Sequence, residues 1–226
     1  MRPLIIMNGE KIDWFHTVIR MLMYLAGVAV LALGMSLQTA SGLGVAALTC
    51  FATTLSMLTG KTLGFWITAT YVACIVAQFT ILRREFQPRI LLELCFSTLI
   101  GGFTDFFMAV NPLHPAALPI QVETMLPSLA VTAFGVSLVV NMGVVPNAPD
   151  GLVQVIAEKI KRRFGDVKVV FDCSHVAMSL VLSLALMHNL GGFGVTTAIS
   201  ALFLGHVINI ANKLFAQRFV RAAFGK

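Results

Sequence analysis

Six apolar runs set the limits on what this chain can fold into. They cover residues 17–37, 63–82, 90–110, 125–144, 167–187 and 193–212. A helix needs about 20 mainly apolar residues to cross the hydrocarbon core of a bilayer, and each run is close to this length. An open chain can satisfy its backbone hydrogen bonds within lipid only as a helix. The sequence therefore predicts an all-α, polytopic membrane helix bundle with six transmembrane helices.

The composition supports this interpretation, because 58% of the 226 residues are hydrophobic and only 12% are charged. A soluble domain carries about 25% charged residues. Six spans and their connections use the whole length, so we expect a single membrane domain over residues 1–226. Glu10 and Asp13 precede the first apolar run, and no small-residue cleavage site follows it. We therefore interpret this run as a retained span and not as a signal peptide.

The basic residues are distributed unevenly between the two sides of the predicted bundle. Fifteen of the sixteen Lys and Arg residues precede or open the first span, lie between spans two and three or four and five, or follow span six. Only Lys61 lies in an alternate connection. The positive-inside rule then predicts that both termini lie in the cytoplasm. Because topology accounts for the net charge of +6, we expect the lipid bilayer as a partner and no nucleic acid.

The cysteines give no sign of a metal or redox site. Cys50, Cys74, Cys95 and Cys173 lie in apolar stretches without C-x-x-C spacing. Such residues usually act as small buried hydrophobes, so we predict no metal and no cofactor.

Two connections are more than simple turns. Ser41-Gly42-Leu43-Gly44 follows the first span and leads into an apolar run over residues 45–58, which could be half-inserted or spanning. Residues 141–151 follow the fourth span and lead into a predicted helix that reaches Phe164. In that helix Leu152, Ile156, Ile160 and Phe164 recur every four residues, a pattern typical of an amphipathic helix at or partly within the interface.

An offset of 101 residues superposes the two halves of the chain. It places Gly34 on Gly135, Ser36 on Ser137, Gly42 on Gly143 and Gly64 on Gly165, and a two-residue adjustment places Ser97 on Ser200. Each half contains three spans, an odd number, so the second half must be upside down relative to the first. The sequence thus predicts a 3+3 inverted repeat, about 15–110 and about 122–212, with two short broken or amphipathic helices.

Several short motifs resemble the YczE/YitT-like family of bacterial integral membrane proteins. They are Leu43-Gly44-Val45, Leu63-Gly64-Phe65-Trp66, the Gly101-Gly102-Phe103-Thr104-Asp105 segment, Pro149-Asp150-Gly151 and the segment from Gly192 to Gly205. The sequence departs from the family at residues 46–49, where a proline and an acidic or polar pair are expected. The resemblance implies a multi-pass membrane protein and no known activity.

Ionisable residues within predicted spans are the first candidates for a substrate site, because they are costly in lipid. Asp105 lies in the third span, and Asp172 and His175 share one face of the fifth. The latter pair could relay protons. The alternatives are interhelical hydrogen bonds, a helix-end position for Asp105, and a pairing of Asp172 with Lys168.

Two further polar groups complete the candidate set. His206 and Asn209 begin a stripe on the sixth span that ends at Asn212. Asn141, Asn147 and Asp150 surround the second break, where a broken helix exposes backbone groups that can bind a substrate or an ion. Cavity lining and simple hydrogen bonding between helices both remain open for these residues.

These features favour a small secondary-transporter-like protein with an ion or small-molecule substrate. The alternative is a non-transporting scaffold or accessory subunit. H-E-x-x-H and G-x-S-x-G motifs are missing from the sequence, so we predict no enzymatic activity and no catalytic residues. The substrate, the coupling ion and a homodimeric state cannot be predicted from the sequence.

Overall fold

The computed structural model describes residues 14–83, 88–111, 117–145 and 147–224, and every regular element in this part is helical. The α-helices are α1 (Trp14–Ser41), α2 (Ala47–Thr59), α3 (Leu63–Leu82), α4 (Leu92–Val110), α5 (Leu118–Met142), α6 (Ala148–Lys159), α7 (Phe164–Leu186) and α8 (Val195–Phe224). A short 3-10 helix, Pro88–Leu91, precedes α4.

Five helices in the described part are long and apolar enough to cross a membrane: His16–Ser41, Leu63–Leu82, Leu92–Val110, Leu118–Met142 and Asp166–Leu186. They overlap the first five predicted spans. The predicted sixth, residues 193–212, overlaps α8, which is not one of the five. The chain is therefore a multi-pass, all-helical membrane protein. Helix α5 begins at Leu118, earlier than the predicted Met125. The prediction was late because Pro119, Gln121 and Glu123 interrupt the apolar pattern in the first turns.

The two predicted short helices are present. Helix α2 has 13 residues, which corresponds to about 20 Å of helix against a hydrocarbon thickness of about 30 Å, so it is too short to span. Helix α6 ends at Lys159, and the prediction that it reaches Phe164 is wrong. Lys161 adopts a positive φ of 55°, and the Arg162 N–H bonds back to the Ala157 carbonyl oxygen. The chain therefore turns here before α7 begins.

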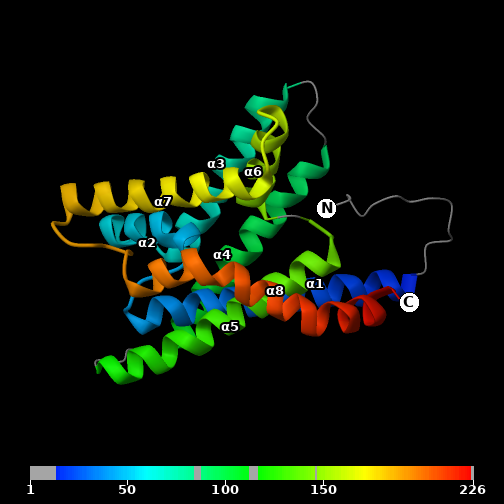
Figure 1. The fold of residues 1–226 in the computed structure, drawn as a ribbon, viewed down its shortest axis with the longest axis horizontal. Coiled ribbons are helices and arrows are strands. Elements are labelled where there is room, and N and C mark those ends of the chain that lie inside the picture. The colour runs from blue at the N-terminus through cyan, green and yellow to red at the C-terminus, as the bar shows by residue number, and fades with distance from the viewer. Residues whose placement is uncertain (1–13, 84–87, 112–116, 146, 225–226) are drawn as a thin grey trace.

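Helices α1, α5 and α8 lie side by side, and α1 and α5 run in opposite directions (Figure 1). Glycines allow this close crossing: a Cβ atom on Gly34 would collide with Thr132, and one on Gly135 would lie 2.5 Å from the Leu31 nitrogen. At one end of the pair, the Arg20 guanidinium donates hydrogen bonds to the Met142 carbonyl at 2.6 Å and the Gly143 carbonyl at 2.7 Å. Arginine therefore caps the C-terminus of α5, where carbonyls lack helical partners.

The remaining helices interlock the two halves of the chain. Helix α3 packs on α4, and α4 on α1. Helix α6, from the second half, packs on α3 of the first, whereas α2, from the first half, packs on α7 of the second. Each short helix is therefore held mainly by the opposite half.

Candidate functional site

The first turn of α6 rests on a buried polar pair. The Gln78 side chain donates hydrogen bonds to Glu93 Oε2 at 2.7 Å and to the Ala148 carbonyl oxygen at 3.2 Å. Gln78 and Glu93 are 1% and 2% exposed. A Cβ atom on Gly151 would lie 2.8 Å from Glu93 Oε1, so glycine permits the contact between this turn and the carboxylate. The Pro149-Asp150-Gly151 motif thus docks α6 on α3 and α4.

Sequence analysis did not single out this pair. A signal was available, because Glu93 is a carboxylate within a predicted span, and such residues mark functional sites by default. Its partner Gln78 comes from a different helix. Sequence periodicity does not show which helices pack together, so it could not predict that Gln78 and Glu93 are paired.

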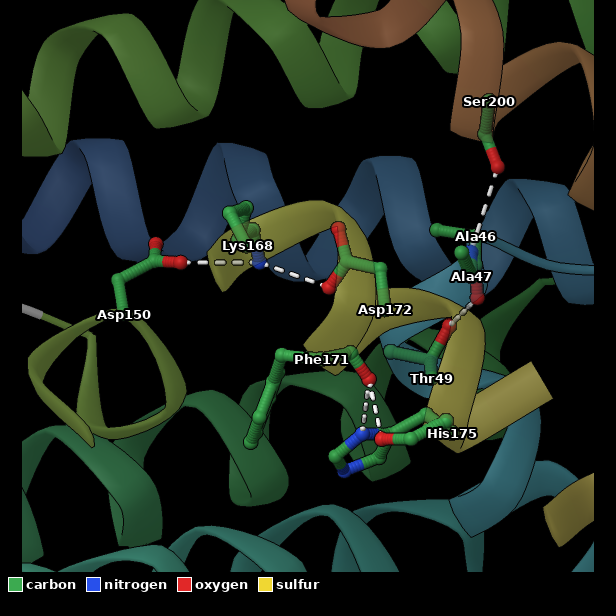
Figure 2. A network of polar contacts seen from close by, with 10 residues as sticks. Ala46, Ala47, Thr49, Asp150, Lys168, Phe171, Asp172, His175 and Ser200 are labelled. Atoms are coloured by element: carbon green, nitrogen blue, oxygen red, sulfur yellow. Dashed lines mark hydrogen bonds and ion pairs between the residues drawn. The ribbon is translucent and has the colours of Figure 1, made fainter. Parts of the chain in front are cut away.

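The same turn of α6 carries an ion-pair cluster with α7. The Lys168 ammonium lies 3.0 Å from Asp150 Oδ1 and 2.9 Å from Asp172 Oδ1, as Figure 2 shows. We call Asp150, Lys168 and Asp172 the charged triad. Its side chains are 38%, 25% and 26% exposed, respectively. Asp172 thus pairs with Lys168, which was the alternative to a pairing with His175.

His175 has a different set of neighbours. Its Nδ1 atom lies 3.0 Å from the Phe171 carbonyl oxygen. The imidazole packs against the ring of Phe171, with centroids 4.4 Å apart, and edge-on against Phe51 at 6.2 Å. Among the described contacts none is a hydrogen bond between His175 and Asp172, so the two residues share a face of α7 without direct bonding.

Asn147 lies at the N-cap of α6, as its place in the sequence predicted, but its side chain does not cap the helix. The Asn147 Oδ1 atom is buried and receives no hydrogen bond from a described residue. An acceptor with no partner therefore lies three residues before Asp150.

Helix α2 contacts the same helix α7 through uncharged groups. The Ala47 N–H donates to Ser200 Oγ of α8 at 3.3 Å, and the Thr54 hydroxyl lies 2.7 Å from the Ser179 hydroxyl of α7. Ser179 also donates to the Cys50 carbonyl oxygen at 3.2 Å. Figure 2 shows Ala47 and Ser200 in the same view as the charged triad. Helix α7 thus contacts the charged first turn of α6 and hydroxyl groups of α2.

The motifs that carry the family resemblance meet in space. The Thr196 N–H donates to the Leu43 carbonyl oxygen at 2.9 Å, and the Val45 N–H to the Gly192 carbonyl oxygen at 3.3 Å. A Cβ atom on Gly44 would lie 2.6 Å from the Gly194 nitrogen, so glycine allows the two backbones to approach. The glycines before α8 therefore bring this segment against its neighbours.

Asp105 lies apart from the charged triad. Its Oδ1 atom accepts a hydrogen bond from the Gly64 N–H at 2.7 Å, which satisfies a free donor in the first turn of α3. Leu63-Gly64 and Gly101–Asp105 are therefore also in contact. The side chain lines a cavity of about 460 Å³ between the ends of four helices.

The other predicted site residues take different positions. The Asn141 side chain donates to Asn212 Oδ1 at 2.8 Å, and Ser137 donates to the same oxygen at 2.5 Å. This arrangement bonds α5 to α8. Asn209 is exposed, in contrast to its predicted interior position, and the His206 side chain lies outside the described residues. No cluster that could hold a metal ion occurs among the His, Cys, Asp and Glu residues that the structure describes.

Comparison with known proteins places the chain in a family. Residues 18–213 match the family described as "Family of unknown function (DUF6198)". The chain is similar to the uncharacterized membrane protein YczE of Bacillus subtilis (strain 168), with 32% identity over 147 residues. The match covers 63% of this chain and 65% of the length of that relative, less than two thirds of it. No solved structure matches the chain. The chain therefore belongs to the family of unknown function DUF6198 and is a YczE-like membrane protein.

Proposed function

We propose that this chain is a small secondary-transporter-like protein of a bacterial inner membrane, built from six spans as a 3+3 inverted repeat. An ion or small molecule binds beside α7, between the charged triad and the hydroxyl contact that Thr54 of α2 makes with α7. The proposal includes no chemical change of the substrate. Three features support the repeat, and a fourth supports the location of the site.

The helix boundaries agree with the offset found in the sequence. Helices α1 and α5 end at Ser41 and Met142, α2 and α6 begin at Ala47 and Ala148, and α3 and α7 begin at Leu63 and Phe164. Each pair differs by 101 residues. The starts of α4 and α8 include the predicted two-residue adjustment. This agreement supports two homologous structural units, because boundaries are set by local turns and not by hydropathy alone.

The crossing of α1 and α5 supports a two-fold relation. Gly34 contacts Thr132, and Gly135 contacts Leu31. The 101-residue offset places Leu31 on Thr132 and Gly34 on Gly135, so the two contacts are equivalent. Reciprocal contacts of this kind are expected where a two-fold axis passes through an interface.

Packing between the units is also reciprocal. If the two units are exchanged, the contact between α3 and α6 becomes the contact between α7 and α2. In the same way, the contact between α1 and α4 becomes the contact between α5 and α8. All four contacts occur. One difference is that α3 packs on α4, whereas in the described part α7 makes no contact with α8 of similar extent.

The location of the charged triad is the observation that carries the transport proposal. It joins the first turn of the short broken helix α6 to the span α7, both in the second unit, and the same turn of α6 packs against Gln78 and Glu93 of the first unit. In inverted-repeat transporters, sites form at such discontinuous helices near the repeat interface. Two carboxylates for one ammonium, together with the Asn147 Oδ1 acceptor, favour a substrate that carries positive charge or hydrogen-bond donors.

Binding should appear first as ligand-dependent stability. We expect at least one member of a panel of small ions and metabolites to raise the melting temperature of the purified protein. A ligand at 100 times its Kd adds about 2.7 kcal/mol. The Asp172→Asn variant should lose this shift, whereas Asp166→Asn, an exposed carboxylate on the same helix, should keep it. Uptake of that ligand into proteoliposomes, again sensitive to Asp172→Asn, would then establish transport. Uptake that Asp172→Asn leaves unchanged would contradict the proposed site.

A non-transporting scaffold or accessory subunit is the second candidate. It is favoured by the fact that Lys168 already contacts both carboxylates, so that the triad is satisfied without a ligand. This candidate gains support if the triad variants lower stability equally with and without every ligand of the panel.

The proposed orientation makes a separate prediction. With both termini in the cytoplasm, a reporter fused after Lys226 should report the cytoplasmic side, and one inserted at residues 112–116 should report the opposite side. The physical reason is the preference of Lys and Arg for cytoplasmic connections. Reporter activity on the same side at both positions would contradict the six-span arrangement.

A further inference from the structure

The cavity beside Asp105 is distinct from the site proposed above. The end of α1, the C-terminal half of α2, the start of α3 and the end of α4 enclose it, with a volume of about 460 Å³. Gln78, which contacts the first turn of α6, lies roughly 22 Å along α3 from Leu63 at the cavity wall. The cavity size falls in the range of about 300–1,000 Å³ that is typical of small-molecule sites.

The polar atoms of the cavity wall are almost all acceptors. The hydroxyls of Thr39, Thr53 and Ser56 donate their protons to backbone carbonyl oxygens at 3.0, 3.0 and 2.7 Å. Because these protons are already donated, the three hydroxyl oxygens can only accept hydrogen bonds from a ligand. Thr62 instead accepts a hydrogen bond from the Phe65 N–H at 3.3 Å. The described residues of the wall include neither a basic side chain nor an amide side chain.

Among the described residues, no cation pairs with the carboxylate of Asp105. Only Oδ1 is engaged by Gly64, and neither ion pair among the described residues includes Asp105. Lys61 is close in sequence to the wall residue Thr62, but its ammonium lies over the Phe65 ring, 4.5 Å from the centroid. A carboxylate in a partly apolar site is stabilised by a cation that reaches it.

The rest of the wall is apolar and includes Met57, Leu63, Met108 and Ala109. Methionine side chains adapt to the shape of an apolar ligand. A small metal ion would leave this surface uncovered, whereas an ammonium group with short alkyl substituents would cover it and place its charge at Asp105. We propose that the cavity binds a small organic cation of the alkylammonium class. Binding there requires no transport step and is therefore independent of the function proposed above.

The test uses the full-length purified protein with butylammonium and tetramethylammonium as probes. Butanol serves as the neutral counterpart of butylammonium, and NaCl controls for ionic strength. We expect an alkylammonium ion to raise the melting temperature and to give a measurable Kd by calorimetry, and butanol and NaCl to do neither. Asp105→Asn should weaken binding at least about tenfold, because it removes a charged acceptor. Asparagine can still accept the Gly64 N–H, so the start of α3 is retained.

Two further variants complete the test. Glu123→Gln removes an exposed carboxylate from α5, outside the cavity, and should bind as the parent protein does. Ala109→Phe fills the cavity without touching the charge, and it should also weaken binding, so the proposal can be tested even if Asp105→Asn fails to fold. The proposal is overturned if neither alkylammonium ion binds, if butanol binds as tightly as butylammonium, or if both cavity variants bind within about twofold of the parent.

Discussion

The Gly34→Ala variant is expected to melt at a much lower temperature than the parent protein. A Cβ atom at this position would lie 2.7 Å from the Thr132 nitrogen and 2.8 Å from its Cα atom. Both are backbone atoms that no side-chain rotation can move, so α1 and α5 would have to separate. Overpacking costs about 1–3 kcal/mol when side chains can adjust, and we expect the upper part of this range or more here. Thermal unfolding in one detergent measures the effect.

Gly102→Ala is the matched control for this prediction. Gly102 lies inside α4, and a Cβ atom there would meet nothing within 4 Å. Alanine should therefore be neutral or stabilising by up to about 1 kcal/mol, because it is the better helix former. Under the proposed repeat, Gly135→Ala should resemble Gly34→Ala. If Gly34→Ala were as harmless as Gly102→Ala, the close crossing of α1 and α5 would be contradicted.

Hydropathy was sufficient to predict those helices whose whole length is apolar. The run 63–82 matches α3 at both ends, because lipid and protein interior both favour apolar side chains along it. Helix α5 shows the limit of this signal, since it includes Gln121 and Glu123 in its first turns. Residues outside the hydrocarbon core can be helical without being apolar, so the predicted start at Met125 was late.

Helical periodicity failed for a different reason at the end of α6. Spacing by four residues shows which side chains would share a face if the chain stayed helical, and it does not say that the helix continues. Leu152 is 6% exposed, whereas Ile160 is 55% exposed. The apolar pattern therefore continued past the turn at Lys161, where a positive φ ends the helix.

The candidate site was predicted in part. Asp172 was identified because ionisable residues are costly in a membrane, and Asp150 because it lies at the second helix break. The structure brings both to one ammonium. The hydroxyl contacts between α2 and α7, such as Thr54 with Ser179, could not be predicted. A serine or threonine within a helix can bond to its own backbone, so its partner on another helix depends on how the two helices pack.

Lys168→Met is expected to be the most damaging change within the charged triad. It leaves the Asp150 and Asp172 carboxylates without the ammonium that lies 3.0 and 2.9 Å from them. Removing one partner of a fully buried ion pair costs about 3–5 kcal/mol. The triad side chains are between 25% and 38% exposed, and solvent therefore weakens their interaction. We expect a smaller loss of unfolding free energy, of about 2–3 kcal/mol, measured by thermal or denaturant unfolding. Lys213→Met, an exposed lysine on α8, should change stability by no more than about 0.5 kcal/mol.

The triple variant Asp150→Asn, Lys168→Met, Asp172→Asn separates stability from function. It removes all three charges together, and neutral replacement of a buried ion cluster is often harmless. We therefore expect it to recover most of the stability that Lys168→Met loses. A triple variant less stable than Lys168→Met alone would show that like-charge repulsion between the carboxylates is not the cause of the loss. If the triple variant folds like the parent and no longer responds to a ligand that stabilises the parent, the three charges act in binding. If it folds and still responds, the triad only joins α6 to α7, and the substrate site must lie elsewhere.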